Sequence, residues 1–560
     1  MTITAGTHAA GTARHGQLSA RVVAGALAIP ALLYGVALVV RLFATALISF
    51  PMTEGSAYYI AVARNLVAGR GLEIDALWSY ATPPLVLPRP AFELWQPLAS
   101  AIAAGPMAVL GATFDAAQIG FALLGALLAP LAWLVAQDAS RRVGLPPRRA
   151  ATVAVGTGLL VAVTGPLVLS SAIPDSTLPF TVLGVAACLV MPAAANGSRA
   201  AMIGLGVLLA LAYLTRMEAV WLGLAFVAMA LAAGRGWRVT APRIAAVATV
   251  AAVCALPWWL RNALVFGTPL PGQVSDNVFL TRNEQIFSFL DRPTLEGFLA
   301  QGLPAIVGNV AAAAWHNTVS VLLIPAGAVA LFGLITVAVA AFRRDSPLRP
   351  ASGGALGALL LSGAITFGAT TLLFPVATLW GTFEHAAGPL LVGLAVAGLL
   401  GADAFVATVV RWRNWPRTNS WLAPLAIIAL TVPLTGLALF GASRHAQTER
   451  RAIAQVADAL PAALAQLGVG DSGPLISDRP IWLSDATGRS AIALPDEPPQ
   501  SVLQLAAAFD APAVVVLESR GRYPAALREL DAATCFTEMP LSTADAQSAT
   551  VFKIAPECVR

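Results

Sequence analysis

Charged side chains are scarce in this chain: only 11% of the 560 residues are charged, while 58% are hydrophobic. A soluble protein of this length needs far more charge to cover its surface. The basic residues occur in short clusters between apolar runs, which is the pattern of loops that orient a membrane protein rather than of a nucleic-acid-binding face. The sequence therefore predicts an integral membrane protein with many spans and excludes nucleic acid as a partner.

Cysteines are also few, and none has metal-type spacing. Cys188 and Cys254 lie inside apolar runs and are expected to be small core residues. Cys535 and Cys558 lie in a polar C-terminal region. If that region is extracytoplasmic, they could form a disulfide that closes a loop of about 24 residues and stabilises the fold by about 3 kcal/mol. Internal repeats are absent too, which argues against the usual architecture of secondary transporters.

Apolar runs and basic clusters together predict a mainly α-helical, polytopic protein of roughly eleven spans with a cytoplasmic N-terminus. The expected spans are residues 22–50, 117–136, 150–170, 180–195, two short spans within 201–233, 244–260, 320–342, 355–376, 387–410 and 421–442. The expected domains are a disordered cytoplasmic segment 1–20, a membrane domain 21–445 with outer loops 51–97 and 261–317, and a small extracytoplasmic α/β domain 446–560.

The charged interruption at residues 215–218 is placed by the same reasoning. A continuous span here would put Arg216 and Glu218 near the bilayer centre and would bring the next basic cluster to the wrong side. Two short spans that meet outside satisfy both constraints. We therefore expect Arg216 and Glu218 at the outer face.

The first outer loop carries the most informative stretch. Residues 54–68 have helical periodicity, and Gly69 ends the helix. Glu54 then lies in the first helical turn, where the partial positive charge of the helix favours a carboxylate. Such a carboxylate at the water–lipid boundary could accept a proton from a hydroxyl group, or it could simply cap the helix.

The polar C-terminal region has the pattern of a small α/β domain. Residues 452–467 and 501–509 are expected to be helical, and residues 513–517 and 550–554 to be strands. No catalytic constellation is visible in this region. It could present an acceptor or cover an active site.

Four motifs resemble those of the GT-C fold glycosyltransferases, the superfamily of protein O-mannosyltransferases and lipid A aminoarabinose transferases. They are EGSAYYIAVARNLVAGRGLEID from Glu54, LTRMEA from Leu214, PWWLRNALVFGTPLP from Pro257 and GTFEHAAGPLL from Gly381. The family often has two adjacent acids in the first loop, whereas here Gly55 stands at the second position.

The resemblance implies transfer of a hexosyl or pentosyl group from a polyprenyl-phosphate donor to an extracytoplasmic protein, lipid or glycan. It implies that Glu54 is the catalytic base of an inverting reaction. Arg216 and Arg261, both expected at the outer boundary, would bind the donor phosphate. Arg216 could instead pair with Glu218, and Arg261 could be an interfacial anchor.

Further candidates for substrate binding are Tyr58, Asp175, Glu218, Glu384 and His385. Asp175 could equally be a local turn cap. Glu384 and His385 could bind acceptor, phosphate or a divalent metal, although no third ligand stands at a suitable spacing. No metal ligand is therefore assigned, and metal dependence is left open.

Two other functions remain open at this point. A transporter or flippase of a lipid-linked or small solute would show charged or broken helices in mid-membrane, whereas here the polar residues gather at one face. A non-catalytic assembly protein would use the C-terminal domain to bind envelope partners. The one-sided distribution of polar residues favours an enzyme of the cytoplasmic membrane that works at its outer surface.

Overall fold

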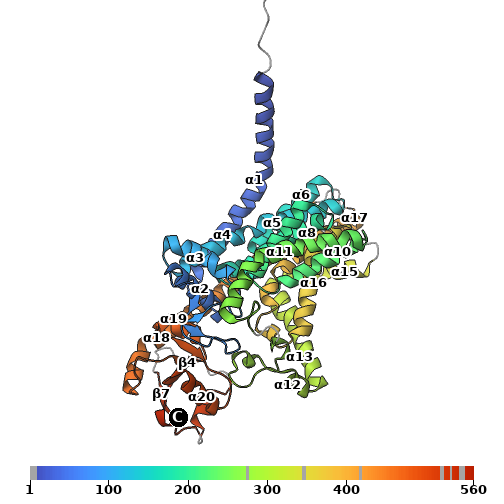
Figure 1. Ribbon diagram of the computed structural model, residues 1–560. Coiled ribbons are helices and arrows are strands. Elements are labelled where there is room, and N and C mark those ends of the chain that lie inside the picture. The colour runs from blue at the N-terminus through green and yellow to red at the C-terminus, as the bar shows by residue number, and fades with distance from the viewer. Residues whose placement is uncertain are drawn as a thin grey trace, which may run out of the picture.

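The computed structural model describes residues 9–272, 276–343, 349–414, 419–517, 522–529, 532–541 and 549–559. It consists of a region of long helices and a C-terminal α/β region, which lies at the lower left in Figure 1. The first helix, α1 (Ala9–Leu47), projects from the helical region on the side away from the α/β region. It begins inside the segment 1–20 that was expected to be disordered, and residues 1–8 lie outside the described residues.

Eight helices in the described part are long and apolar enough to cross a membrane, or up to nine with one bent pair counted as a span. The eight are Leu27–Leu47 of α1, Phe114–Arg142, α8 (Thr177–Ala195), α11 (Trp237–Phe266), Leu303–Ala326, α16 (Ala355–Leu373), α17 (Gly388–Trp412) and α18 (Leu422–Gln466). Phe114–Arg142 comprises α4 (Phe114–Ala126) and α5 (Leu128–Arg142). In the bent pair, α6 (Pro147–Val163) meets α7 (Gly165–Ala172) at 48°. The chain is a multi-pass membrane protein, as its composition predicts.

The described part of the chain also has four shorter apolar helices, two of which account for the difference between nine spans and the expected eleven. They are α3 (Leu98–Leu110), α9 (Arg199–Tyr213), α10 (Ala219–Ala232) and α15 (Ala328–Phe342). α9 and α10 flank Arg216 and correspond to the two expected short spans. A helix of 15 residues is about 22 Å long, which is less than the hydrocarbon core of roughly 30 Å.

The chain around Gly327 corrects the expected span at 320–342. An apolar helix already begins at Leu303, inside the expected outer loop 261–317, as α13 (Leu303–Trp315). It continues through the π-helix η3 (His316–Leu323) and α14 (Ile324–Ala326). Gly327 then has φ 49° and ψ −120°, which ends the helix before α15 begins. Hydropathy follows apolar residues and does not detect such a break.

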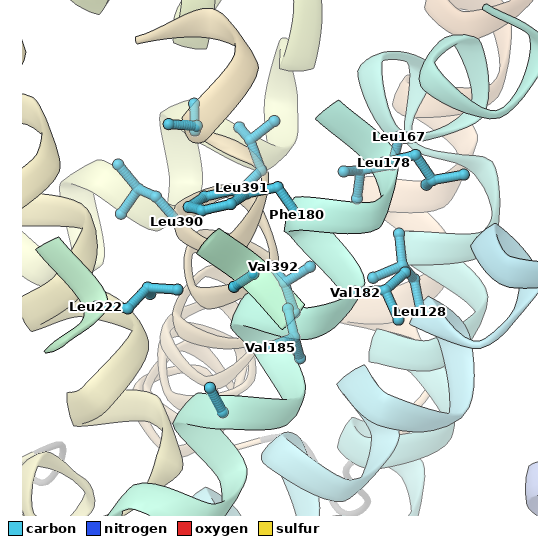
Figure 2. Packing of buried hydrophobic residues seen from close by; sticks show 14 of the residues in the cluster. Leu128, Leu167, Leu178, Phe180, Val182, Val185, Leu222, Leu390, Leu391 and Val392 are labelled. Carbon is cyan, nitrogen blue, oxygen red and sulfur yellow. The ribbon is translucent and has the colours of Figure 1, made fainter. Parts of the chain in front are cut away.

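One part of the core of the helical region lies between α8 and α17. Figure 2 shows Phe180 and Val185 of α8 beside Leu391 and Val392 of α17, and all four side chains are buried. Small residues let the helices approach closely: a Cβ atom at Gly388 would lie only 1.8 Å from the hydroxyl oxygen of Thr181. Close packing of this kind drives helix association in membranes.

The first loop contains the helix α2 (Glu54–Val67), which confirms the periodicity in the sequence. Thr53 caps it, because its hydroxyl oxygen accepts a hydrogen bond from the Ser56 N–H at 3.1 Å. Gly69, with φ 77°, turns the chain out of the helix. Glu54 is therefore the first residue of α2, as expected.

The C-terminal region contains a six-stranded sheet of order β2-β5-β4-β6-β8-β7. Its strands are β2 (Ala76–Leu77), β4 (Leu475–Ser477), β5 (Ala491–Ala493), β6 (Ala513–Val516), β7 (Phe536–Pro540) and β8 (Thr550–Ile554). Its helices are α19 (Pro480–Thr487) and α20 (Pro499–Phe509). The pairs among β2, β5, β4 and β6 are parallel, and β8 pairs antiparallel with β6 and β7. α20, β6 and β8 confirm the elements expected at 501–509, 513–517 and 550–554.

Short elements connect these parts. They are β1 (Glu73–Ile74), β3 (Arg89–Pro90), α12 (Leu295–Ala300), and the 3₁₀ helices η1 (Asp276–Phe279), η2 (Asn283–Phe287), η4 (Arg349–Gly353), η5 (Ala377–Trp380), η6 (Glu384–Ala386), η7 (Ala525–Arg528) and η8 (Pro556–Cys558). The expected domain boundary at residue 446 lies inside α18, which extends unbroken from its apolar part toward the sheet.

The first loop also contributes a strand to the C-terminal sheet, which no pattern in the sequence indicated. Ala76 and Leu77 of β2 pair in parallel with Ala491 and Ile492 of β5. The Tyr80 hydroxyl group donates a hydrogen bond to the Ala493 carbonyl oxygen. The loop that carries Glu54 is thus anchored in the C-terminal region.

Cys535 and Cys558 form a disulfide across the end of the chain. Replacing both by serine is expected to lower the free energy of unfolding by about 3 kcal/mol, because the bond restricts the unfolded chain. Thermal unfolding of the detergent-solubilised protein measures this loss. An unchanged unfolding temperature would contradict a stabilising role.

Candidate active site

A cavity of about 790 Å³ lies where the helical region meets the C-terminal sheet region. Its wall comes from the first loop, the turns between α7 and α8 and between α9 and α10, the connection from α16 to α17, and the segment around α19. The sequence-predicted residues in this wall are Glu54, Asp175, Arg216, Glu218, Glu384 and His385. Candidates from four separate loops therefore share one cavity.

Glu54 lies at the point where the cavity wall meets α19. Its Oε1 atom accepts a hydrogen bond from the Trp482 N–H at 3.1 Å, and the Trp482 ring lies 5.7 Å from the Phe50 ring. Burial raises the pKa of Glu54 from 4.5 to about 7, while nearby Arg479 opposes that rise. A carboxyl group with this pKa can take up and release a proton near neutral pH.

Asp175 and His385 form a second polar group. The Asp175 Oδ1 atom accepts a hydrogen bond from the Thr177 N–H at 2.7 Å, and its Oδ2 atom lies 3.6 Å from His385 Nδ1. The Thr177 hydroxyl oxygen lies 2.6 Å from the same nitrogen. Burial raises the pKa of Asp175 to about 6 and, with the nearby Arg216 charge, lowers the pKa of His385 to about 3. The imidazole is therefore neutral at physiological pH and can offer a hydrogen bond without a charge.

Arg216 is fixed by two partners in the cavity wall. Its Nη2 atom donates to Glu218 Oε1 at 2.5 Å and its Nη1 atom donates to Ser176 Oγ at 2.8 Å. Its Nε atom is buried and has no hydrogen-bond partner in the described part of the chain. The turn that carries Ser176 is joined to α2, because Ser56 Oγ donates to the Pro174 carbonyl oxygen at 3.0 Å. Arg216 is thus pre-oriented on the same framework as Glu54.

Two predicted site residues lie outside the cavity wall. The Arg261 guanidinium group stacks 5.0 Å from the ring centres of Trp258 and of Phe266. Tyr58 is buried, and its hydroxyl oxygen accepts a hydrogen bond from the Phe92 N–H at 2.7 Å. Both side chains are therefore held in aromatic surroundings outside the cavity wall.

Several cavity residues have no counterpart among the predictions. Tyr59 lines the wall in place of Tyr58. Gln96 Oε1, Asn277 Oδ1 and Trp482 Nε1 are buried polar atoms without a hydrogen-bond partner among the described residues. Buried polar atoms are normally paired, so a ligand rich in hydroxyl groups would satisfy these three. Aromatic side chains add to the wall: Trp78, Trp95, Phe287 and Trp380.

Acidic groups dominate the charge of the cavity wall. The carboxyl groups belong to Glu54, Asp175, Glu218, Glu284, Glu384, Glu449, Asp478 and Asp496. Arg216 and Arg479 are the arginines in the same wall. A phosphate group inside the cavity would therefore find compensating charge beside one of these two arginines.

Glu384 and His385, left open as metal ligands, both line the cavity. In the described segments, no group of three or more His, Cys, Asp or Glu side chains could hold a metal ion. The pair therefore has no third ligand of this kind in that part of the chain.

The chain has a GT-C-like fold. Among solved structures, ArnT from Cupriavidus metallidurans in the apo state is similar, with a TM-score of 0.50 and 15% sequence identity over 95% of this chain and 98% of that chain. The Archaeoglobus fulgidus oligosaccharyltransferase in the apo form has a TM-score of 0.51 and 13% identity over 87% of this chain and 69% of that chain. These comparisons confirm the fold expected from the four motifs.

Sequence comparisons add no closer relative. No protein-family model matches the chain, and no curated protein sequence matches it. The fold and the residues of the cavity wall are therefore the features that bear on an activity.

Proposed function

We propose that the protein is a membrane glycosyltransferase that transfers a sugar from a polyprenyl-phosphate donor to a hydroxyl acceptor. One observation carries the proposal: in a GT-C fold, Glu54 and Arg216 line the same cavity although they come from different loops. The similar solved structures include a protein described as an oligosaccharyltransferase, which supports sugar transfer. The acceptor, whether protein, lipid or glycan, is left open.

The proposed reaction is a single displacement with inversion. Glu54 takes the proton of the acceptor hydroxyl group, and the oxygen attacks the anomeric carbon from the face opposite the phosphate. The bond between the anomeric carbon and the phosphate oxygen breaks, and polyprenyl phosphate leaves with the electron pair. Phosphate is already a good leaving group, so stabilisation of its charge by Arg216 replaces acid catalysis.

The remaining polar groups are assigned to binding. Glu218 and Ser176 hold Arg216 in orientation. Asp175, Glu384 and the neutral His385 are assigned to hydroxyl groups of substrate, together with the unpaired atoms of Gln96 and Asn277. Aromatic rings in the wall can pack against the apolar faces of a sugar ring.

We also propose that the cavity and the C-terminal α/β domain, residues 446–560, lie outside the cytoplasmic membrane, with the N-terminus in the cytoplasm. The distribution of basic clusters supports this orientation. The Cys535–Cys558 disulfide supports it as well, because disulfides persist in oxidising compartments.

The activity is tested with the full chain in proteoliposomes. Radiolabelled polyprenyl-phosphate sugars, hexoses and pentoses in turn, are supplied with an extract of envelope acceptors, and label in the acceptor and free polyprenyl phosphate are both measured. Equal amounts of the two products support transfer. Movement of donor across the bilayer without release of polyprenyl phosphate would point to the flippase alternative and overturn the proposal.

The pH dependence of transfer follows from Glu54. Only the ionised carboxylate can act as a base, so its active fraction increases as pH rises through the pKa of about 7. Single-turnover rates measured from pH 5.5 to 8.5 are expected to rise and then level off above that pKa. A rate that is flat or falls across this range would contradict Glu54 as the base.

A further inference from the structure

The first turn of α19 in the C-terminal region meets Glu54 in the cavity. Figure 1 shows α19 between α2 and strand β4, and α19 contacts both. The Trp482 N–H donates to Glu54 Oε1 at 3.1 Å, across 428 positions of sequence. An amide at the N-terminal end of a helix is well placed to hold a carboxylate. Part of the environment of the proposed base is therefore supplied by the C-terminal region.

Arg479 precedes this turn and faces the same cavity. Its guanidinium carbon lies 4.7 Å from the centre of the Trp482 ring. Trp482 is also the residue whose backbone N–H donates to Glu54. Stacking on an indole ring fixes the direction of a guanidinium group. Arg479 is also the main favourable charge on Glu54, and it opposes the effect of burial on the pKa of that carboxyl group.

The contact between α19 and the first loop is fixed at several other points. Arg64 of α2 forms an ion pair with Asp485 of α19. Ser484 Oγ donates a hydrogen bond to the Asp75 carbonyl oxygen at 3.2 Å, next to the strand pairing of β2 with β5. α19 is therefore held against α2 independently of Arg479, so a change at Arg479 can leave the docking intact.

Resting on the proposed function, we propose that Arg479 is a positioning residue: its guanidinium group, stacked on the ring of Trp482, whose N–H donates to Glu54, places a positive charge in the cavity wall near that carboxylate. The C-terminal domain then does more than cover the site, because it sets the protonation state of the base. Transfer by the full chain should depend on this one arginine in a pH-dependent way.

Other titratable groups among the described residues also lie around Glu54. Asp478 disfavours its ionised form, and His445 and Glu449 of α18, which packs against α19, line the same cavity. The helix α3, which packs against α2, carries no titratable side chain. On the side of β1, Glu73 lies at the far end of α2, where its carbonyl oxygen accepts from Asn65 Nδ2 at 2.7 Å. Arg479 is the basic group expected to dominate.

The test compares pH profiles of single-turnover transfer for the wild-type protein, Arg479→Gln and Arg479→Lys. Loss of the charge is expected to move the rising limb of the profile upward by about one pH unit, with activity recovering at high pH. The lysine variant should shift it less. Arg64→Gln is the matched control, because it removes an arginine between α2 and α19 without changing the charge beside Glu54, and its midpoint should equal that of the wild type.

A substrate-free measurement accompanies the kinetics. A protonated carboxyl group gives an infrared carbonyl band, and the band that is missing in Glu54→Gln belongs to Glu54. The pH at which this band has lost half its intensity should shift in Arg479→Gln in the same direction as the midpoint of the rate profile. An equal loss of rate at every pH, or an unmoved infrared midpoint, would overturn the positioning role. If Glu54→Gln itself keeps full transfer activity, the proposed function fails instead, and the two failures are distinct.

Discussion

Glu54→Gln is expected to lower the rate of transfer by about 10² to 10⁴-fold, the range that general base catalysis supplies. Glutamine has nearly the same shape and can still accept the Trp482 N–H bond, but it cannot take a proton. The rate of the chemical step is measured in a single turnover with saturating donor, and donor affinity should change little. A variant that retains more than about a tenth of the rate would remove Glu54 as the base.

Stability provides the control for this variant. The pKa of Glu54 is raised in the folded protein, so the unfolded chain binds fewer protons than the folded one between pH 4.5 and about 7, and stability falls as pH rises through that interval. Glutamine does not ionise, so the variant does not lose stability in this way. At pH 8 the variant should therefore unfold at the same temperature as the wild type or higher. Asp115→Asn, at an exposed acid in the first turn of α4, should affect neither quantity.

Arg216→Gln is expected to lower transfer by about 10² to 10³-fold, comparable with the loss of one donor that stabilises developing negative charge. Its two fixed hydrogen bonds already orient the guanidinium group, so the proposed mechanism needs little reorganisation at Arg216 when the phosphate departs. Arg216→Lys should recover part of the rate, because it keeps the charge and loses the planar fork. The rates of the wild type and of Arg216→Gln are measured with the normal donor and with a donor that has a better leaving group. The ratio between the two proteins should be smaller with the better leaving group.

Two further variants separate charge from folding. Arg216→Gln leaves Glu218 without its partner, so the double variant with Glu218→Gln restores neutrality in the cavity wall. The double variant should fold like the wild type and remain slow; recovery of transfer would show that Arg216 has only a structural role. Arg261→Gln changes an arginine outside the cavity wall and should leave the chemical step within about twofold.

Features set by local periodicity were accessible from the sequence. The helix α2 follows from apolar spacing, with Glu54 in its first turn and Gly69 at its end. The position of Arg216 in a break between two short helices follows from the charged interruption between two apolar segments. These features depend on interactions within a few residues or on a simple preference for lipid or water.

Features set by long-range packing were not accessible. Nothing near Trp482 indicates that its amide would meet Glu54, 428 positions earlier. The two-residue strand β2 is too short for an alternating pattern to identify it. Which of Tyr58 and Tyr59 lines the cavity depends on how α2 is rotated about its axis. Gly55 and Tyr59 lie four residues apart on one helical face, and both line the cavity.

The participation of the first loop in the C-terminal sheet constrains the order of events during synthesis. Tyr80 and its hydrogen-bond partner Ala493 are 413 positions apart, and the strand pairing of β2 with β5 spans a similar length. At ordinary translation speeds the ribosome needs roughly 20 to 80 s to cover that distance. During this interval the nascent loop has no partner strand, so the cavity wall is completed only after nearly the whole polypeptide has been made.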